Sequence, residues 1–161
     1  MLASLALAAC VPVSKVETPP VTIGYAKGFN TGRVASQKTI TLRSYAGEGR
    51  EKKEVLGAAC VLQSEELSSK IVTPSQIVLP LFIQSPSLKE RGRPTPLRVE
   101  CKHDGMTGVE SFNAVEKTTG VATNAGIAGA ILTAVVSGAI ASSTPWEFPG
   151  GMDVTLAPPA K

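Results

Sequence analysis

The sequence has very little of the residue types that build metal sites and catalytic centres. It contains one histidine and three cysteines among 161 residues, and no two cysteines have the Cys-x-x-Cys spacing. Structural zinc sites need about four Cys or His ligands, so the chain predicts no metal site. It also lacks a Gly-x-Ser-x-Gly motif, a phosphate-binding glycine loop and a two-metal carboxylate cluster. We therefore expect no enzymatic activity, no cofactor and no small-molecule substrate.

Two further positions carry acid–base groups, and neither predicts catalysis. His103 lies in a polar turn next to Asp104, where it would act as a general base only if a nucleophile were brought to it. A solvated turn residue is the simpler interpretation. Glu65 and Glu66 are adjacent, and adjacent side chains on a strand point to opposite faces. They are therefore a pair in the sequence only.

The sequence also lacks a strong excess of positive or negative charge. The 16 Lys and Arg residues nearly balance the 13 Asp and Glu residues, which gives a net charge of +3. The charges occur in small mixed clusters, such as residues 48–54 and 89–93, and this pattern is typical of a solvated surface. A nucleic-acid-binding domain would gather its basic residues on one face, so we expect no nucleic-acid partner. The length allows one ordinary domain with tails.

The N-terminus carries an apolar run that stops at a cysteine. Leu7-Ala8-Ala9-Cys10 matches the bacterial lipobox, in which small residues fit the signal peptidase and the thiol is acylated before cleavage. The match predicts a lipoprotein signal peptide over residues 1–9 and a lipidated Cys10, with palmitate or a similar acyl chain in a membrane. Val11 follows the cysteine where lipoproteins retained in the inner membrane carry Asp, which favours the outer membrane.

One feature of a secretory signal is missing, because such signals normally begin with positive charges and the first charge here is Lys15. Either the true start lies upstream and the signal is truncated, or the run is a plain apolar N-terminus with a buried free Cys10. Residues 10–36 are rich in Pro, Gly, Thr and Ser, which predicts a tether between lipid and domain. Within it, residues 21–25 favour a short edge strand.

With Cys10 assigned to lipid, Cys60 and Cys101 remain as a pair. An exported protein meets an oxidising environment, so the sequence favours a disulfide between them. In the chain-entropy model, closing a loop of this length contributes on the order of 4 kcal/mol to stability. The alternative is two reduced cysteines in the core.

Short alternating stretches between turn residues predict a mainly β domain over residues 37–117, built as a small antiparallel β-sandwich pinned by the disulfide. Residues 97–102 are the clearest case, because apolar and charged side chains alternate there. The turn His103-Asp104-Gly105 should join them to residues 107–115 as a hairpin. Around Pro74-Ser75 the pattern indicates either two strands or one strand broken at a corner. Residues 146–161 supply the last strand and a Pro-rich tail.

Residues 84–96 predict a polar loop with three prolines and a basic tip made of Lys89, Arg91 and Arg93. The tip is either solvated or a local binding feature, and the solvated interpretation is the simpler one.

Residues 118–145 form an uncharged segment rich in Gly and Ala. Small side chains recur in it every four residues along two neighbouring rows, which predicts a helix with one broad smooth face before the last strand. Such a face lets two backbones approach closely. The predicted contact face consists of Ala122, Gly126, Gly129, Ala130, Thr133, Ala134, Ser137 and Gly138.

Three interpretations of this segment remain open. It is a helix or helical hairpin packed on a partner or on itself, a helix inserted in a membrane, or a mobile insertion. A helix over residues 121–142 would be about 33 Å long, enough for a bilayer core. Its Gly, Ala, Ser and Thr residues contribute little transfer energy, which disfavours the membrane. Trp146, just past its end, fits an interfacial anchor or a core aromatic.

Several motifs occur in an order that resembles small envelope lipoproteins of Gram-negative bacteria. These carry a PEGA-like β domain and often a glycine-rich insertion before the last strand. The motifs are Gly57-Ala58-Ala59-Cys60-Val61-Leu62, Val72-Thr73-Pro74, Val78-Leu79-Pro80, Leu97-Arg98-Val99-Glu100-Cys101, His103-Asp104-Gly105, Trp146-Glu147-Phe148-Pro149 and Met152-Asp153-Val154-Thr155-Leu156. The resemblance spans residues 39–156. It implies a disulfide between the two thiols and a non-catalytic surface or assembly module.

The sequence thus predicts a lipid-anchored protein of the bacterial cell envelope that faces the periplasm. We expect it to act as a structural or assembly component that contacts a protein partner, or a second copy, through the small-residue segment. The alternative is a membrane-inserting, oligomerising component of a secretion or conjugation assembly.

Overall fold

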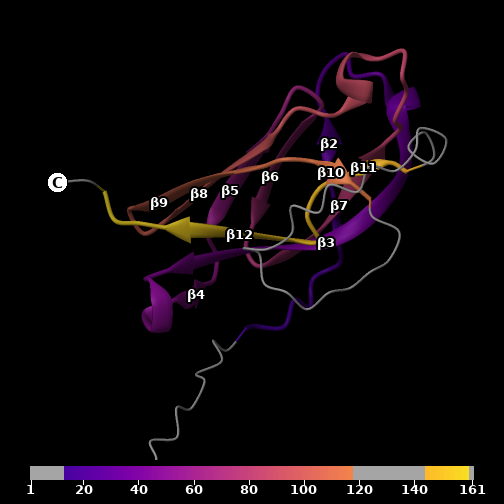
Figure 1. Cartoon of the computed structure of the whole chain (residues 1–161). Helices are drawn as coiled ribbons and strands as arrows, with labels where there is room; N and C mark the ends of the chain where they lie inside the picture. The colour runs from indigo at the N-terminus through magenta and orange to yellow at the C-terminus, as the bar shows by residue number, and fades with distance from the viewer. Residues whose placement is uncertain (1–12, 118–143, 160–161) are drawn as a thin grey trace, which may run out of the picture.

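The computed structural model of the chain describes residues 13–117 and 144–159, which form two β-sheets packed face to face (Figure 1). The predicted mainly β class is confirmed for these residues. The first sheet contains β1 (Val21–Thr22), β3 (Val34–Ala46), β4 (Lys53–Val55), β7 (Ser75–Phe82), β10 (Val115–Glu116), β11 (Trp146–Glu147) and β12 (Gly151–Leu156). The second contains β2 (Gly24–Tyr25), β5 (Ala59–Gln63), β6 (Leu67–Val72), β8 (Leu97–His103) and β9 (Met106–Phe112).

Three short 3-10 turns complete the described structure: η1 (Thr31–Arg33), η2 (Gly49–Glu51) and η3 (Lys89–Gly92). Across residues 13–117 and 144–159 we find no helix long and apolar enough to cross a membrane. The predicted helical segment over residues 118–145 lies outside the described residues, except for its last two positions.

Most neighbouring strands run antiparallel, as predicted, but two pairs are parallel. β12 runs parallel to the C-terminal half of β3, and β1 runs parallel to the middle of β7. The parallel β12 pairing arises because the chain crosses from β11, at one edge of β7, to the far edge of β3 before β12 begins. Local alternation cannot reveal such a crossing.

The alternation seen in the sequence decides which side chains enter the core. Leu97, Val99 and Cys101 of β8 are fully buried, whereas Arg98 and Lys102 are exposed on the outer face. Between the sheets, the core gathers Ile23, Ile40, Leu42, Leu62, Leu67, Ile77, Leu79, Phe82, Met152, Val154 and Leu156. Burying a side chain of this size contributes about 1.5–3 kcal/mol, so this layer is the main source of stability.

The hairpin predicted over residues 97–115 is present as β8 and β9. Asp104 and Gly105 form the two-residue turn with φ values of 45° and 78°. Positive φ at both central positions defines a type I′ turn, whose twist matches that of the flanking strands. Asp and Gly tolerate this conformation well, which explains the Asp-Gly sequence.

Near Pro74 the chain breaks at a corner rather than forming a hairpin within one sheet. β6 belongs to the second sheet and β7 to the first, and Thr73-Pro74 connects them. A second proline, Pro80, lies inside β7. There it faces the gap between β1, which pairs with Ile77 and Val78, and β11, which pairs with Phe82. No ladder hydrogen bond needs the missing N–H at that place.

The two sheets are connected along both long edges of the sandwich, which we call its seams. On one side the chain passes directly from β1 in the first sheet to β2 in the second, and the buried Ile23 marks the crossing. On the other side Thr107 of β9 and Ala157, just beyond β12, exchange two backbone hydrogen bonds of 2.9 Å. The strands approach so closely there that a Cβ on Gly108 would lie 2.2 Å from the carbonyl oxygen of Thr155.

The expected tether over residues 10–36 is too long at its C-terminal end. Residues 21–25 form two two-residue strands in different sheets, β1 and β2, in place of the single edge strand predicted there, and β3 begins at Val34, before the predicted start of the domain at residue 37. Between residues 21 and 36 the chain changes sheet twice, from β1 to β2 and from β2 to β3. The periodic signal of a single strand is therefore absent.

Candidate functional site

The two predicted contact elements of the chain lie outside the described residues. Cys10, the predicted lipidation site, falls before Val13. The predicted contact face falls within residues 118–143 and comprises Ala122, Gly126, Gly129, Ala130, Thr133, Ala134, Ser137 and Gly138. The structure describes the base from which this segment leaves the domain and to which it returns.

That base is a two-stranded stem made of β10 and β11. The strands pair antiparallel, with Val115 opposite Glu147 and Glu116 opposite Trp146. The next pair beyond the stem is also bonded, because the Lys117 N–H donates to the Pro145 carbonyl at 3.0 Å. The two ends of the uncharged segment are therefore held side by side at the edge of the first sheet (Figure 1).

The loop over residues 84–96 is hydrogen-bonded to this stem. Arg91 donates to the Glu116 carboxylate at 2.9 Å and also to the side-chain oxygen of Gln84. In return, the Trp146 indole N–H donates to the backbone carbonyl of Arg91 at 3.2 Å. Arg91 thus links the loop to both strands of the stem.

Arg93 makes a second link between loop and stem. Its Nε donates to the Ala114 carbonyl at 3.1 Å, and its guanidinium lies 5.6 Å from the centroid of the Trp146 ring. A cation above an aromatic face at this distance contributes about 0.5–1 kcal/mol at an exposed site. Arg91 and Arg93 thus stay partly or fully exposed, as a solvated tip would be, but both also bind the stem. Their partners in the stem lie more than twenty residues away in sequence, where no local pattern can reveal them.

The stem also connects to the core. Trp146 pairs with Phe82 of β7 and is mostly buried. Phe148 follows it into the core and meets the Phe82 ring edge to face, with centroids 6.3 Å apart. Glu147 accepts a hydrogen bond of 3.2 Å from Lys38 of β3. Trp146 is thus a core aromatic at the start of β11, one of the two roles predicted for it.

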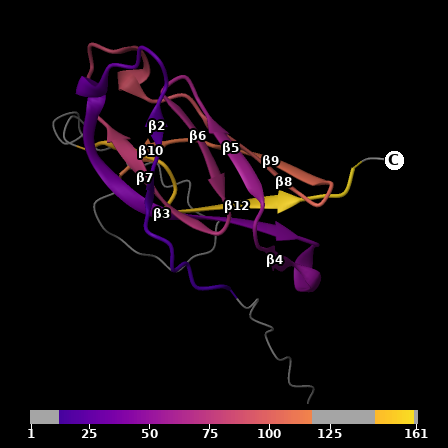
Figure 2. The same cartoon turned by 180° about the vertical axis from the view of Figure 1, so that it is seen from behind.

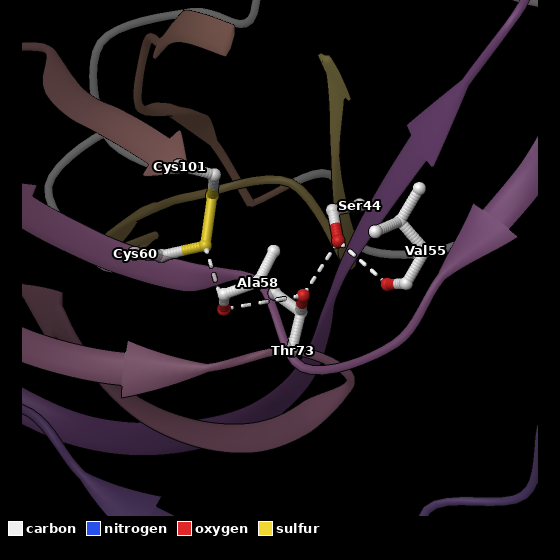
Figure 3. The surroundings of a disulfide bond; sticks show 6 residues. All are labelled: Ser44, Val55, Ala58, Cys60, Thr73 and Cys101. Atoms are coloured by element: carbon white, nitrogen blue, oxygen red, sulfur yellow. Dashed lines mark hydrogen bonds between the residues drawn. A yellow bond between two sulfur atoms is a disulfide. The ribbon is translucent and has the colours of Figure 1, made fainter. Parts of the chain in front are cut away.

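The predicted disulfide between Cys60 and Cys101 is present (Figure 3). The two residues are directly opposite each other on β5 and β8, with their Cα atoms 4.0 Å apart. This short separation matches a non-hydrogen-bonded pair of an antiparallel ladder. The bond therefore joins two neighbouring strands of one sheet and does not bridge the two layers.

A small hydroxyl network connects the layers beside the disulfide. Ser44 of β3 donates to the Val55 carbonyl at 2.8 Å, so its oxygen accepts from the Thr73 hydroxyl 2.5 Å away. The Ala58 carbonyl accepts from the backbone N–H of Thr73 at 2.9 Å. The same carbonyl lies 3.7 Å from the Cys60 sulfur, which carries no proton in the disulfide (Figure 3). Ser44 and Thr73 are buried, and bonding satisfies their hydroxyls.

The remaining chemical groups form no reactive cluster in the described part of the chain. His103 Nε2 lies 3.2 Å from a carboxylate oxygen of the exposed Asp104, at the tip of the β8–β9 hairpin. Glu66 is buried and accepts hydrogen bonds from Thr95, whereas Glu65 is exposed. Over residues 13–117 and 144–159 no group of three or more His, Cys, Asp or Glu side chains is arranged to hold a metal.

A cavity of about 540 Å³ lies beside the loop at the stem's end of the sandwich. Three basic and three acidic side chains line it, so its charge is balanced. The Glu66 carboxylate is already occupied by Thr95 and Ser64. Its lining residues are Arg33, Glu65, Glu66, Leu88, Lys89, Glu90, Gly92, Arg93, Pro94, Thr95, Pro96 and Asn113.

Comparison with known proteins returns no match to a protein-family model, a curated protein or a solved structure. The resemblance to PEGA-like envelope lipoproteins therefore stays a prediction from the sequence motifs.

Proposed function

We propose that this protein is a non-catalytic, lipid-anchored component of the bacterial cell envelope that serves a structural or assembly role. In this proposal the acyl chain on Cys10 holds the protein at a membrane, with the outer membrane favoured. The β domain faces the periplasm and presents the uncharged segment to a protein partner or to a second copy. The contact is made through the small-residue face around Gly126 and Gly129.

The observation that carries this proposal is the clamped stem. β10 and β11 hold both ends of the segment, and Arg91 and Arg93 fasten the stem to the domain. A surface insertion can leave and re-enter a domain without paired strands at its two ends. The paired and fastened strands β10 and β11 therefore favour a segment with a defined role. Fixing the ends of a contact element lowers the entropy lost when that element binds, which favours association.

The stem also bears on the alternative of a single membrane-spanning helix. A helix over residues 121–142 would separate its ends by about 33 Å. The chain from Lys117 to residue 121 and from residue 142 to Pro145 covers seven residues, about 25 Å when fully extended at about 3.5 Å per residue. Because Lys117 and Pro145 are hydrogen-bonded, this geometry disfavours one straight span. A segment that turns back on itself fits the stem better.

Crosslinking tests the contact face directly. We expect Gly126→Leu with Gly129→Leu to abolish crosslinks between this protein and its partner, or between two copies, because leucine side chains prevent close backbone approach. The matched control is Ile127→Leu with Ile131→Leu, which changes apolar residues off the predicted face. Crosslinks that persist in the glycine variant would refute the contact face.

The second candidate function is a membrane-inserting, oligomerising component of a secretion or conjugation assembly. It is favoured by the absence of charge between Thr118 and Trp146. Carbonate extraction of a Cys10→Ser variant separates the two functions. Release of the unlipidated protein supports the lipid anchor as the sole attachment, and retention in the membrane pellet supports insertion of the segment.

A further inference from the structure

Ser14 is held against the β domain by two charged side chains. Its backbone N–H donates to Glu54 Oε2 at 2.6 Å, and its hydroxyl donates to the same oxygen at 2.7 Å. Its backbone carbonyl accepts from Arg43 Nη1 at 3.0 Å. Arg43 and Glu54 thus bind the side chain, the amide and the carbonyl of Ser14, near the start of the described residues.

The two residues that bind Ser14 form a preorganised site on neighbouring strands. Arg43 on β3 and Glu54 on β4 form an ion pair with each other, and their side chains are 18% and 6% exposed. Hydrogen bonds to a charged partner contribute more to stability than bonds between neutral groups. A carboxylate this deeply buried would lose hydrogen bonds if Ser14 left.

Beyond Ser14 most residues are exposed until the chain joins the first sheet. Residues 17–20 are exposed, and Lys15 has 85% of its side chain accessible. The next attachments are β1, which pairs with β7, and Ile23 in the core. Residues 14–20 therefore form a strap that is fastened at both ends and mostly exposed between them, with Val16 half-buried.

The fastening point lies far from the stem. Glu54 pairs with Tyr45 near the end of β3, whereas Val34 at the start of β3 is level with Phe82 and so with Trp146 of the stem. Eleven residues separate Val34 from Tyr45 along β3, which is about 36 Å at about 3.3 Å per residue. Figure 2 shows β4 and β10 toward opposite ends of the sandwich, as in Figure 1.

We propose that the strap is a releasable spacer that holds the β4 end of the domain near the lipid surface and directs the stem away from it. This inference rests on the proposed lipidation of Cys10. With Ser14 fastened, four residues separate the lipid from the domain, a reach of at most about 14 Å. With Ser14 released, eleven residues reach from Cys10 to Val21, about 38 Å. The fastened state therefore fits a partner that meets the segment away from the anchoring membrane.

Limited trypsin digestion of the full chain tests the strap independently of lipid, because it uses a Cys10→Ser background. The measured quantity is the cleavage rate after Lys15, divided by the rate in a peptide of residues 11–20 with the same substitution. We expect Glu54→Gln to raise this ratio about tenfold, since the strap must leave the domain to enter the protease. Glu110→Gln, on exposed β9, is the matched control and should leave the ratio unchanged.

A second variant tests the strap without altering Glu54, in case Glu54→Gln perturbs the fold. Ser14→Pro removes the amide N–H and the hydroxyl but leaves Arg43 and Glu54 in place, and it lies outside every strand. We expect the same increase in the ratio, together with a cooperative unfolding transition that shows the domain is still folded. A ratio equal to that of the Cys10→Ser background in both variants would overturn the strap.

The spacer role has its own readout in the lipidated protein. Trp146 is the single tryptophan of the chain, so its energy transfer to dansyl-labelled lipid headgroups in vesicles reports the distance of the stem from the membrane. We expect little transfer in wild type and more in Ser14→Pro. Equal transfer in both would overturn the spacer. Failure of Cys10 to take up palmitate would instead remove the anchor while leaving the protease result intact.

Discussion

The indole N–H of Trp146 donates to the backbone carbonyl of Arg91 at 3.2 Å, although 55 residues separate the two in sequence. This bond joins the strand that ends the uncharged segment to a loop that the sequence presents as a separate basic feature. Arg91 then reaches Glu116 on the opposite strand of the stem. The loop and the stem are therefore one structural unit.

Trp146→Phe should loosen this unit without removing its packing. The phenyl ring keeps most of the buried apolar surface, but the bond to Arg91 is lost, which costs about 1 kcal/mol. We expect faster amide hydrogen exchange at Lys117, which donates to Pro145 across the stem. Val115→Thr, at an exposed position of β10, serves as the control. Unchanged exchange in Trp146→Phe would show that the indole bond does not hold the stem.

Removal of the disulfide should destabilise the domain strongly. The bond closes a loop with a sequence separation of 41 residues, and the chain-entropy model assigns on the order of 4 kcal/mol to such a loop. We expect urea denaturation of the Cys60→Ala, Cys101→Ala double variant to show a loss of that order. Cys10→Ser, which removes the cysteine outside the pair, should unfold like wild type. A loss below about 1 kcal/mol would contradict this assignment.

Gly108→Ala should open the seam between β9 and β12. The added Cβ would lie 2.2 Å from the Thr155 carbonyl oxygen, so one strand must shift. Overpacking of this kind costs about 1–3 kcal/mol. The matched control is Gly150→Ala, whose Cβ would meet no atom closer than 3.9 Å. Thermal unfolding of the two variants checks the difference, and equal midpoints would argue against a tightly closed seam.

Acid should weaken the attachment of Ser14. Burial alone would raise the pKa of Glu54, but hydrogen bonds from Ser14 and Arg43, together with the Arg43 charge, outweigh it and lower the pKa below 4.5. The unfolded chain therefore takes up this proton first as pH falls. The stabilisation due to Glu54 is complete above about pH 4.5 and is lost as pH falls through the lower folded pKa.

The check is the free energy of unfolding of wild type and Glu54→Gln between about pH 6 and pH 3. The charged side chain that acts on Glu54 is that of Arg43 on β3. Because every other ionisable group is present in both proteins, the difference between them reports on Glu54. We expect this difference to shrink with acid, and parallel curves would count against the lowered pKa.

The sequence predicts those parts of the fold that depend on local patterns. Alternation and the Asp104-Gly105 turn predict the β8–β9 hairpin, and Pro74 marks a corner between sheets. The disulfide is predicted from the number of cysteines together with the export that the N-terminal motif predicts. The signals for the hairpin and the corner lie within a few residues of the features that they predict, whereas the disulfide joins residues 41 apart.

The parts that sequence reasoning misses depend on contacts between distant segments. The parallel pairing of β12 with β3 follows a crossing over the core, which leaves no periodic signal. Arg91 has its partners 7, 25 and 55 residues away, and Ser14 has Glu54 at a separation of 40. A charged residue in a loop looks solvated until the fold brings its partner beside it.

The most direct test of the central proposal is metabolic labelling with palmitate followed by membrane fractionation, applied to wild type and Cys10→Ser. The predicted result is a labelled wild-type protein in the membrane fraction and an unlabelled variant that is released from it. Equal labelling and equal membrane association of the two proteins would contradict a lipid anchor at Cys10, and with it the proposed place of this protein in the cell envelope.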